Sequence, residues 1–432
     1  MPTVIIGADL CPIEGNQAYF QRGDAVSLFH DLLPEFSAAN LVVANLECPL
    51  IRQNSPIPKT GPTFGAPEDC ITGIKNAGIH ALCLANNHIL DHGEAGLQNT
   101  LRICAASGIA TVGAGSDLDA ARRILIRSLG DVRIGILAVA EHEFSLATRT
   151  TWGANPLDLV DFVRNIKQHR DQFDYLIVLV HGGDEFLVPS PRIKDTCHFL
   201  VEMGANTVIV QHPHVLGGYE EYLGGHIVYG QGALLMDEAI YRDRPSFHEG
   251  FLVKLTLDPP PVTSALPESQ RSFPATAHRE GRGQGEVGAA IPYVPSAAPA
   301  TSLTPSLPLA PRPWGRSVTA AMELIPFLQS APVPGARRMN PEAEREFRQR
   351  ISARSQAIQD VAFVEAEWLK FCQQHRRGYL HGVLGHNRYL RKLDFGGWIS
   401  KLIHSRRSLL GTRNCVLCET HREALHTIFT RL

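Results

Sequence analysis

The sequence predicts an α/β protein in which two packed sheets are flanked by helices. Two observations carry this prediction. Short apolar strands alternate with helical stretches up to about residue 215, and this alternation is typical of parallel sheets. One hairpin interrupts the alternation, and a hairpin within an α/β pattern indicates a second sheet packed on the first.

Five apolar runs predict the buried strands. Each is rich in Val, Ile and Leu and short for a helix. The runs are T-V-I-I-G-A (3–8), L-V-V-A (41–44), A-L-C-L-A (81–85), Y-L-I-V-L-V (175–180) and N-T-V-I-V-Q (206–211). The segment 123–140 predicts the hairpin, because its two apolar halves turn at Gly130 and Asp131.

Helices are predicted between these strands and again near the C-terminus. The second and fourth of the first group end in glycine, which commonly stops a helix. Near the C-terminus, Asn340 can cap a helix and Pro341 suits its first turn. The predicted helices cover 24–33, 95–108, 156–170, 192–204, a stretch from 340, 358–372 and 419–432.

The composition changes to Pro, Ala, Ser and Gly after the first 257 residues. Such a segment buries too little apolar surface to offset its chain entropy, so we predict a disordered insertion. The apolar strands on either side of it can still pair, because loop closure costs rise slowly with length. We therefore divide the chain into an α/β domain (1–257), the insertion (258–316), a returning strand of the core (317–339) and a C-terminal helical region (340–432).

Length and charge exclude several classes of protein. A formal net charge of −2 over 432 residues gives no electrostatic case for nucleic acid as a partner. There is no run of eighteen apolar residues, and the first strand begins within three residues of Met1, so we expect no integral membrane segment and no signal peptide. Nine scattered cysteines fit a reducing compartment, and we expect a cytoplasmic protein.

Cys415 and Cys418 form a C-x-x-C pair, with His421 three residues later. A zinc site is one interpretation of this pattern, but no second ligand pair has matching spacing. Ordinary packing of a helix is the other interpretation. The sequence leaves both open.

Polar groups that bind metal ions follow each of the five apolar runs. The carboxyl ends of the strands are where sites form in an open α/β sheet. One such residue alone is commonly a turn former or a helix cap, but repetition at five strand ends favours a site. The residues are Asp9, Asn45, Glu47, Asn86, Asn87, His88, His181, His212 and His214.

Carboxylate, amide and imidazole donors from separate strands suit a divalent cation such as Mn²⁺, Fe²⁺ or Zn²⁺. A single tetrahedral site needs fewer donors than the sequence offers, so we predict two ions that share a bridging carboxylate. Glu47 is our choice of bridge. The predicted ligands are Asp9, Glu47, Asn87, His181, His212 and His214.

The order of these motifs resembles a known family. The chain contains G-A-D, N-L-E, N-N-H-x-x-D-H-G, H-G-G-D-E, H-P-H-V and I-V-Y-G-Q-G, in that order, between Met1 and about Leu257. This set resembles the CapA family of capsule and poly-γ-glutamate synthesis proteins, whose catalytic-type domain is similar to the calcineurin-like metallophosphoesterases. The resemblance implies a metallophosphatase-like four-layer α/β/β/α sandwich, here with a C-terminal helical extension.

The resemblance also implies roles for individual residues. His212 and His214 stand where metallophosphoesterases carry a G-H-x-H pair, with Gln211 in place of the glycine. The first motif departs from the family pattern D-x-H, because Leu10 and Cys11 follow Asp9. Either Cys11 or Asn16 donates there, or that ion is held weakly. We expect Asn16, Asn45, Asn86 and Glu185 to line the site.

If the site is active, His88 is free to protonate a leaving group. Asp91, three residues on, either orients the His88 ring or begins the next helix. The resemblance implies hydrolysis of a phosphoester or amide bond in a capsule, poly-γ-glutamate or related cell-envelope polymer. The alternatives are a non-catalytic subunit that binds or guides an anionic polymer through its metals, and a scaffold that has lost them. Other envelope-biosynthesis proteins are the expected partners.

Overall fold

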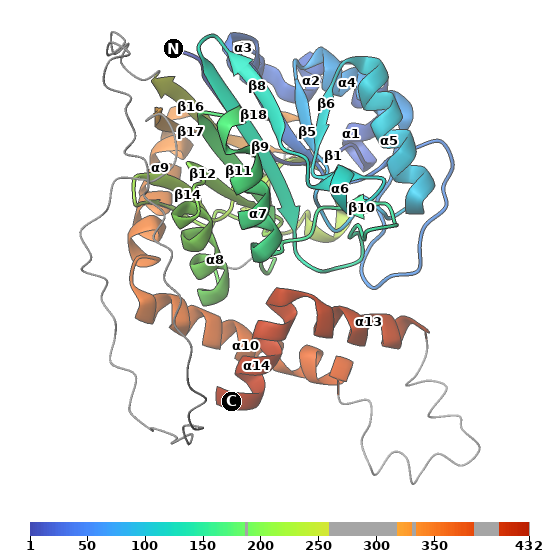
Figure 1. Cartoon of the computed structure of the whole chain (residues 1–432), viewed down its shortest axis with the longest axis vertical. Helices are drawn as coiled ribbons and strands as arrows, with labels where there is room; N and C mark the ends of the chain where they lie inside the picture. Colours follow the sequence, from blue (N-terminus) through green and yellow to red (C-terminus); the bar gives the residue numbers. More distant parts are fainter. Residues whose placement is uncertain (186–188, 259–317, 331–333, 384–405, 432) are drawn as a thin grey trace, which may run out of the picture. The chain divides into compact units, whose positions relative to one another are not determined.

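The computed structural model describes residues 1–185, 189–258, 318–330, 334–383 and 406–431. Two large β-sheets pack against each other, and helices cover their outer faces (Figure 1). The four-layer α/β/β/α arrangement that we predicted is therefore confirmed. The predicted disordered insertion lies outside the described residues, apart from Asp258.

The first sheet has eight strands, with β1 near its centre. On one side of β1 the strands are parallel, and on the other side they are antiparallel. In sheet order the strands are β18 (Ala336–Arg338), β17 (Thr319–Gln329), β16 (Glu249–Asp258), β1 (Thr3–Cys11), β2 (Leu41–Leu46), β5 (Ala81–Cys83) and β6 (Ala110–Val112). β15 (Ala233–Met236) also pairs with the end of β1. β16 and β17, which flank the insertion in sequence, pair along their whole length.

The second sheet has six strands. They are β13 (Tyr219–Tyr222), β14 (Gly225–Val228), β12 (Thr207–Gln211), β11 (Tyr175–His181), β9 (Val132–Ala140) and β8 (Leu125–Leu129). Alternate residues of β9 and β11, such as Ile177 and Val178, pack on the first sheet and on the outer helices respectively. Burial on both faces explains why these strands appear in the sequence as unbroken apolar runs.

The four helices predicted for the α/β domain are present in the predicted order, but the first of them is broken into shorter pieces. The helix predicted over 24–33 is divided into α2 (Ala25–Phe29), a 3₁₀ turn (His30–Leu32) and α3 (Leu33–Ala38). The division occurs because His30 has a φ of 42°, which no α-helix accommodates. The remaining helices of the domain are α1 (Glu14–Gln21), α4 (Ile71–Asn76), α5 (Gly93–Ser107), α6 (Leu118–Ala121), α7 (Leu159–His169) and α8 (Pro191–Glu202).

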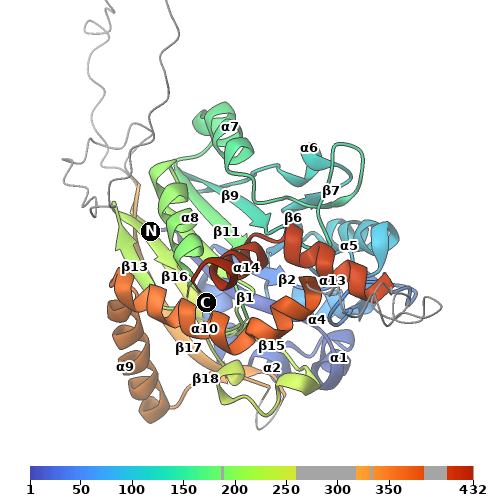
Figure 2. The ribbon, with the colours of Figure 1, turned by 90° about the horizontal axis from the view of Figure 1, so that it is seen from below.

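The C-terminal region is helical, as predicted. It contains α9 (Pro341–Ala357), α10 (Val361–Val383), α13 (Arg406–Leu417) and α14 (Glu419–Arg431). α9 packs Phe347 against Phe251 of the core, whereas α10 and α14 share a small apolar cluster around Trp368. Figure 2 shows α10, α13 and α14 lying across one side of the sandwich. None of the described helices is long and apolar enough to cross a membrane.

Candidate metal centre

The ends of β1, β2, β11 and β12 converge on one buried cluster. Asp9 lies within β1, Glu47 follows β2, and His181 is the last residue of β11. His212 and His214 follow β12. All five side chains are buried, and the two sheets are tied together here because Gln211 donates from Nε2 to the Gly7 carbonyl at 3.0 Å.

The cluster divides into two ligand groups that share Glu47. One group is Glu47, His181 and His212, and the other is Asp9, Glu47 and His214; within each, the ligand atoms lie within 4.8 Å of one another. His181 Nε2 lies 3.4 Å from Glu47 Oε1 and 3.0 Å from Asn87 Oδ1, so Asn87 joins the first group. His214 Nδ1 lies 3.4 Å from Asp9 Oδ2.

The H-P-H turn holds its two histidines in unusual backbone conformations. His212 has a φ of 96° and His214 a φ of 53°, a region that non-glycine residues occupy at an energetic cost. The His212 backbone N–H donates to Asp9 Oδ2 at 3.0 Å, which fixes the turn against the end of β1. Such strain clusters at functional sites, and here it aims both imidazoles at the carboxylates.

The electrostatics of the cluster fit divalent cations. Neither oxygen of Glu47 has a hydrogen-bond partner among the described residues, although the side chain is fully buried. Burial, and then the charge of Asp9, raises the pKa of Glu47 to about 7. Burial opposes charge on His214, but Glu47 and Asp9 outweigh it and raise its pKa to about 10. A cation would replace these protons, because metal ligands must be deprotonated.

Asn45 and Asn86 position the ligands. Asn45 donates from Nδ2 to Asp9 Oδ1 at 2.7 Å. Asn86 donates to Asn45 Oδ1 at 3.1 Å and to the Leu46 carbonyl at 2.8 Å, and its own Oδ1 accepts from the His88 backbone N–H. Both amides therefore use their polar atoms to tie neighbouring strand ends together.

His88 and Asp91 form a pair beside the ligands. His88 Nδ1 lies 2.6 Å from Asp91 Oδ2, and Asp91 Oδ1 accepts from Lys59 Nζ at 2.6 Å. Lys59 Nζ also lies 3.1 Å from His88 Nδ1. Because the carboxylate contact is the shorter one and a carboxylate only accepts, we assign the proton of the neutral ring to Nδ1 and leave Nε2 as the acceptor. Burial, and then the charge of Lys59, lowers the pKa of His88. Asp91 thus orients the ring, and Lys59 is a site residue that sequence reasoning missed.

The structure does not bring Asn16 or Cys11 into the cluster. Asn16 donates to Ser330 Oγ at 3.0 Å and accepts from the Gly335 backbone N–H at 3.1 Å, so its amide is occupied at the β17–β18 turn. The Cys11 thiol donates to the backbone carbonyl oxygen of Glu47 at 3.9 Å and belongs to neither ligand group of the described residues. Neither side chain replaces the histidine of D-x-H, and the Asp9 group is left with three donors.

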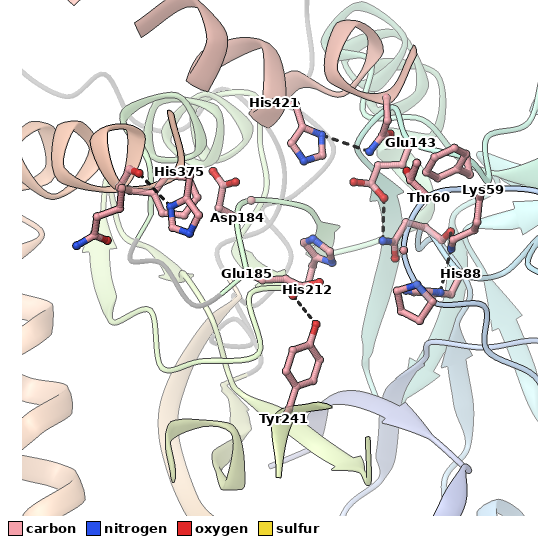
Figure 3. A pocket seen from close by; sticks show the side chains of 18 of the residues that line it. Lys59, Thr60, His88, Glu143, Asp184, Glu185, His212, Tyr241, His375 and His421 are labelled. Atoms are coloured by element: carbon pink, nitrogen blue, oxygen red, sulfur yellow. Dashed lines mark hydrogen bonds between the residues drawn. The ribbon is translucent and has the colours of Figure 1, made fainter. Parts of the chain in front are cut away.

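A cavity of about 770 Å³ adjoins the cluster. Asn87, His88 and His212 line it from the core, together with Glu185, which accepts from Tyr241 Oη at 2.6 Å (Figure 3). Lys370 and His375 of α10, Asn414 of α13 and His421 of α14 line it from the C-terminal helices. These helices therefore form part of the wall of the site.

Glu143 is a second residue that sequence reasoning missed. It follows β9 and accepts from Asn87 Nδ2 at 2.8 Å. Burial acts to raise the pKa of Glu143, but the nearby His212, His421 and Asn87 outweigh it and lower the pKa to about 2. The half-buried carboxylate therefore stays charged and holds the Asn87 amide in place.

Comparison with known proteins shows the family of the chain. Residues 4–238, more than half of the chain, match the family model described as bacterial capsule synthesis protein PGA_cap. The chain belongs to this family. The matched range contains all six ligands that we predicted for this chain and ends before the C-terminal helices.

Two curated PGA_cap relatives are similar over about half of the chain. The capsule biosynthesis protein CapA of Bacillus anthracis is 26% identical over 267 residues, which cover 56% of this chain and 65% of the relative. The PGA biosynthesis protein CapA of Bacillus subtilis (strain 168) is 30% identical over 232 residues, covering 52% and 60% respectively. The chain thus spans about three fifths of the length of these relatives. Among solved structures, a putative 5'-nucleotidase from Staphylococcus aureus is similar with a TM-score of 0.37 and 13% identity, covering 59% of this chain and 51% of that one.

Proposed function

We propose that this protein is a metal-dependent hydrolase that acts on a phosphoester or amide bond in the synthesis of a capsule, poly-γ-glutamate or related polymer. The observation that carries the proposal is the pair of ligand groups that share the buried, unpartnered Glu47 carboxylate. One bridging carboxylate between two donor sets is the arrangement that a two-metal hydrolytic site requires. The CapA names of the relatives supply the polymer class.

The residues of the site have separate tasks in this proposal. Asn87, His181 and His212 would hold one cation, Asp9 and His214 the other, and Glu47 both. Two such cations lower the pKa of a water molecule and neutralise negative charge on the substrate oxygens. His88 faces the same cavity, and its protonated form would give a proton to the leaving group. The buried Asp91 keeps the ring oriented.

A second candidate is a non-catalytic subunit that binds or guides an anionic polymer through its metals. The observation that favours it is the three-donor Asp9 group, because neither Leu10 nor Cys11 supplies the missing ligand. A weakly held cation at that position would bind an acidic polymer without activating water.

The amount of bound metal distinguishes both of these functions from a scaffold protein that has lost its metals. We would measure bound metal after reconstitution with Mn²⁺, together with hydrolysis of an aryl phosphate diester, for the natural chain, Glu47→Gln and His212→Ala. Because Glu47 belongs to both groups and His212 to one, Glu47→Gln should lose both cations and His212→Ala only one. His169→Ala, on α7 and outside the site, is the matched control.

Turnover by the natural chain, lost in both variants and kept in the control, would support the hydrolase. Two bound cations without turnover on phosphate or amide substrates would favour the polymer-binding subunit. A chain that binds no metal would contradict both functions.

A further inference from the structure

The start of α14 places a cysteine and a histidine beside the cavity that adjoins the strand-end cluster. Cys418 immediately precedes α14, and His421 lies three residues later, so both side chains lie on one face of the helix. They meet Glu143 of the core, and the three ligand atoms lie within 4.8 Å of one another. Figure 3 shows His421 and Glu143 next to each other at the edge of the cavity.

Contacts that need no metal hold this end of α14 against the core. Thr420 Oγ1 donates to Glu141 Oε2 at 2.7 Å. Glu423 accepts from Ser190 Oγ at 2.7 Å and from the Arg192 backbone N–H at 3.1 Å. Thr420 and Glu423 lie on either side of His421 in the sequence, so their bonds to the core help to fix the start of α14.

Glu143 is the carboxylate best suited to complete the group. The Cys418 thiol donates to Glu141 Oε2 at 3.8 Å and also lies near Glu419. These two carboxylates already bind Arg192, Thr420 and His142. Glu143 bonds only to Asn87 among the described residues.

Asn414 supplies a partner for the His421 ring. Its Nδ2 lies 3.4 Å from His421 Nδ1, and its buried Oδ1 has no hydrogen-bond partner within the described part of the chain. The two amide atoms are interchangeable by rotation. After rotation Oδ1 would accept from His421 Nδ1–H, which leaves Nε2 as the neutral nitrogen that binds metals.

We propose that Glu143, Cys418 and His421 form a third metal site, separate from the strand-end cluster and selective for zinc-like cations. Thiolate, imidazole and carboxylate together are a zinc donor set, and three protein ligands leave one coordination position open. Glu143 and His421 line the cavity, so that position faces it. An acidic oxygen of a substrate or a water molecule would fill it.

The site would join α14 to the wall of the cavity. Its cation would link the start of α14 to Glu143, in the loop after β9. Glu143 also holds Asn87, so the third site and the strand-end cluster share one hydrogen bond. The proposal does not require that the strand-end cluster hydrolyse anything.

Cobalt substitution tests the proposal directly. Co²⁺ bound to a thiolate gives a near-ultraviolet charge-transfer band that carboxylate and imidazole ligands do not produce. We would titrate Co²⁺ into the metal-free full-length chain, Cys418→Ser, and the matched control Cys415→Ser one helical turn away. The natural chain and Cys415→Ser should develop the band, and Cys418→Ser should lack it and bind one equivalent of Zn²⁺ less.

Near-ultraviolet circular dichroism establishes that Cys418→Ser keeps its tertiary structure, and His421→Gln provides a second variant that should also lose one equivalent. Glu47→Gln should keep the band, so failure of the strand-end metals leaves this result unchanged. The absence of a band in the natural chain, or its persistence in Cys418→Ser, would overturn the proposal.

Discussion

At the scale of single residues, the site contains carboxylates that the surrounding fold holds in buried positions. Asp9 and Glu47 are fully buried carboxylates, and an isolated charge is costly in such a position. Histidines and amides from other strands compensate this cost only in part, as the unpartnered Glu47 oxygens show for the described residues. Proteins retain such an arrangement where a cation completes it.

His88→Gln tests whether His88 transfers a proton. General acid catalysis contributes roughly 10²–10⁴-fold, so we expect kcat to fall by about that factor in the metal-loaded protein. Bound metal should be unchanged, because His88 belongs to neither ligand group. Steady-state kinetics and metal analysis of the same preparation provide the measurement. A loss of metal would instead make His88 a ligand.

Asp184→Asn tests the cost of a buried carboxyl at the cavity wall. Burial raises the pKa of Asp184 well above 3.8, and Tyr379 Oη donates to its Oδ1 at 3.1 Å. A raised folded-state pKa means that the folded protein binds the proton more tightly, so stability falls as pH rises from the unfolded value through the folded one. The neutral amide avoids this loss.

We therefore expect Asp184→Asn to have a higher melting temperature than the natural chain at pH 8 and a smaller advantage at pH 5. Thermal unfolding at the two pH values measures the difference. Equal melting temperatures at both would mean that Asp184 has a compensating positive partner.

At the scale of elements, the C-terminal helices differ in how they attach. Ile358 and Val364, around the start of α10, share one apolar cluster with residues of α8 and of the second sheet. The later part of α10 packs instead on α14, where Trp368 is buried and donates from Nε1 to Thr427 Oγ1 at 2.9 Å. The cavity wall is thus a small unit with its own apolar cluster.

Trp368→Ala should loosen this unit while leaving the sandwich intact. Removal of a buried tryptophan costs about 3–5 kcal/mol, and the cluster has few other members to compensate. Hydrogen exchange should accelerate in α10 and α14 but not in β11. Trp368→Phe, which loses mainly the hydrogen bond, should have a smaller effect. Equal acceleration in β11 would show that the wall and the sandwich unfold together.

At the scale of the whole molecule, the cavity has lining residues both inside and outside the family match. The family match ends at residue 238, whereas Lys370, His375 and His421 line the cavity from beyond it. The matched range includes the strand-end ligands of this chain, and the C-terminal helices line the cavity beside them. The wall is therefore where we expect substrate size to be selected.

A chain that ends at Ala366 keeps the apolar contacts of α9 and the start of α10 and removes the wall. For the proposed hydrolase we expect kcat/KM to rise for a bulky phosphodiester and to stay unchanged for a small aryl phosphate. Kinetics on the two substrates measure the ratio. If kcat/KM instead fell equally for both substrates, the C-terminal helices would take part in the reaction itself.

The sequence alone determined the sandwich and the six predicted ligands that the structure brings together. Strand periodicity and strand-end position are local properties, and the ends of parallel strands meet at one edge of a sheet. The same reasoning overlooked Glu143, although it follows β9 in the same way, because we interpreted that strand only as half of a hairpin.

Only the tertiary structure decided the remaining contacts. Lys59 lies in an irregular segment, and nothing in its neighbours predicts an ion pair with Asp91. We expected Asn16 to line the site near the first motif, but its amide binds Ser330 and Gly335 instead. The sequence offered no further ligand near Cys418 and His421, because the residue that joins them, Glu143, lies 275 positions before Cys418. Packing between distant segments sets these contacts, and no local pattern encodes them.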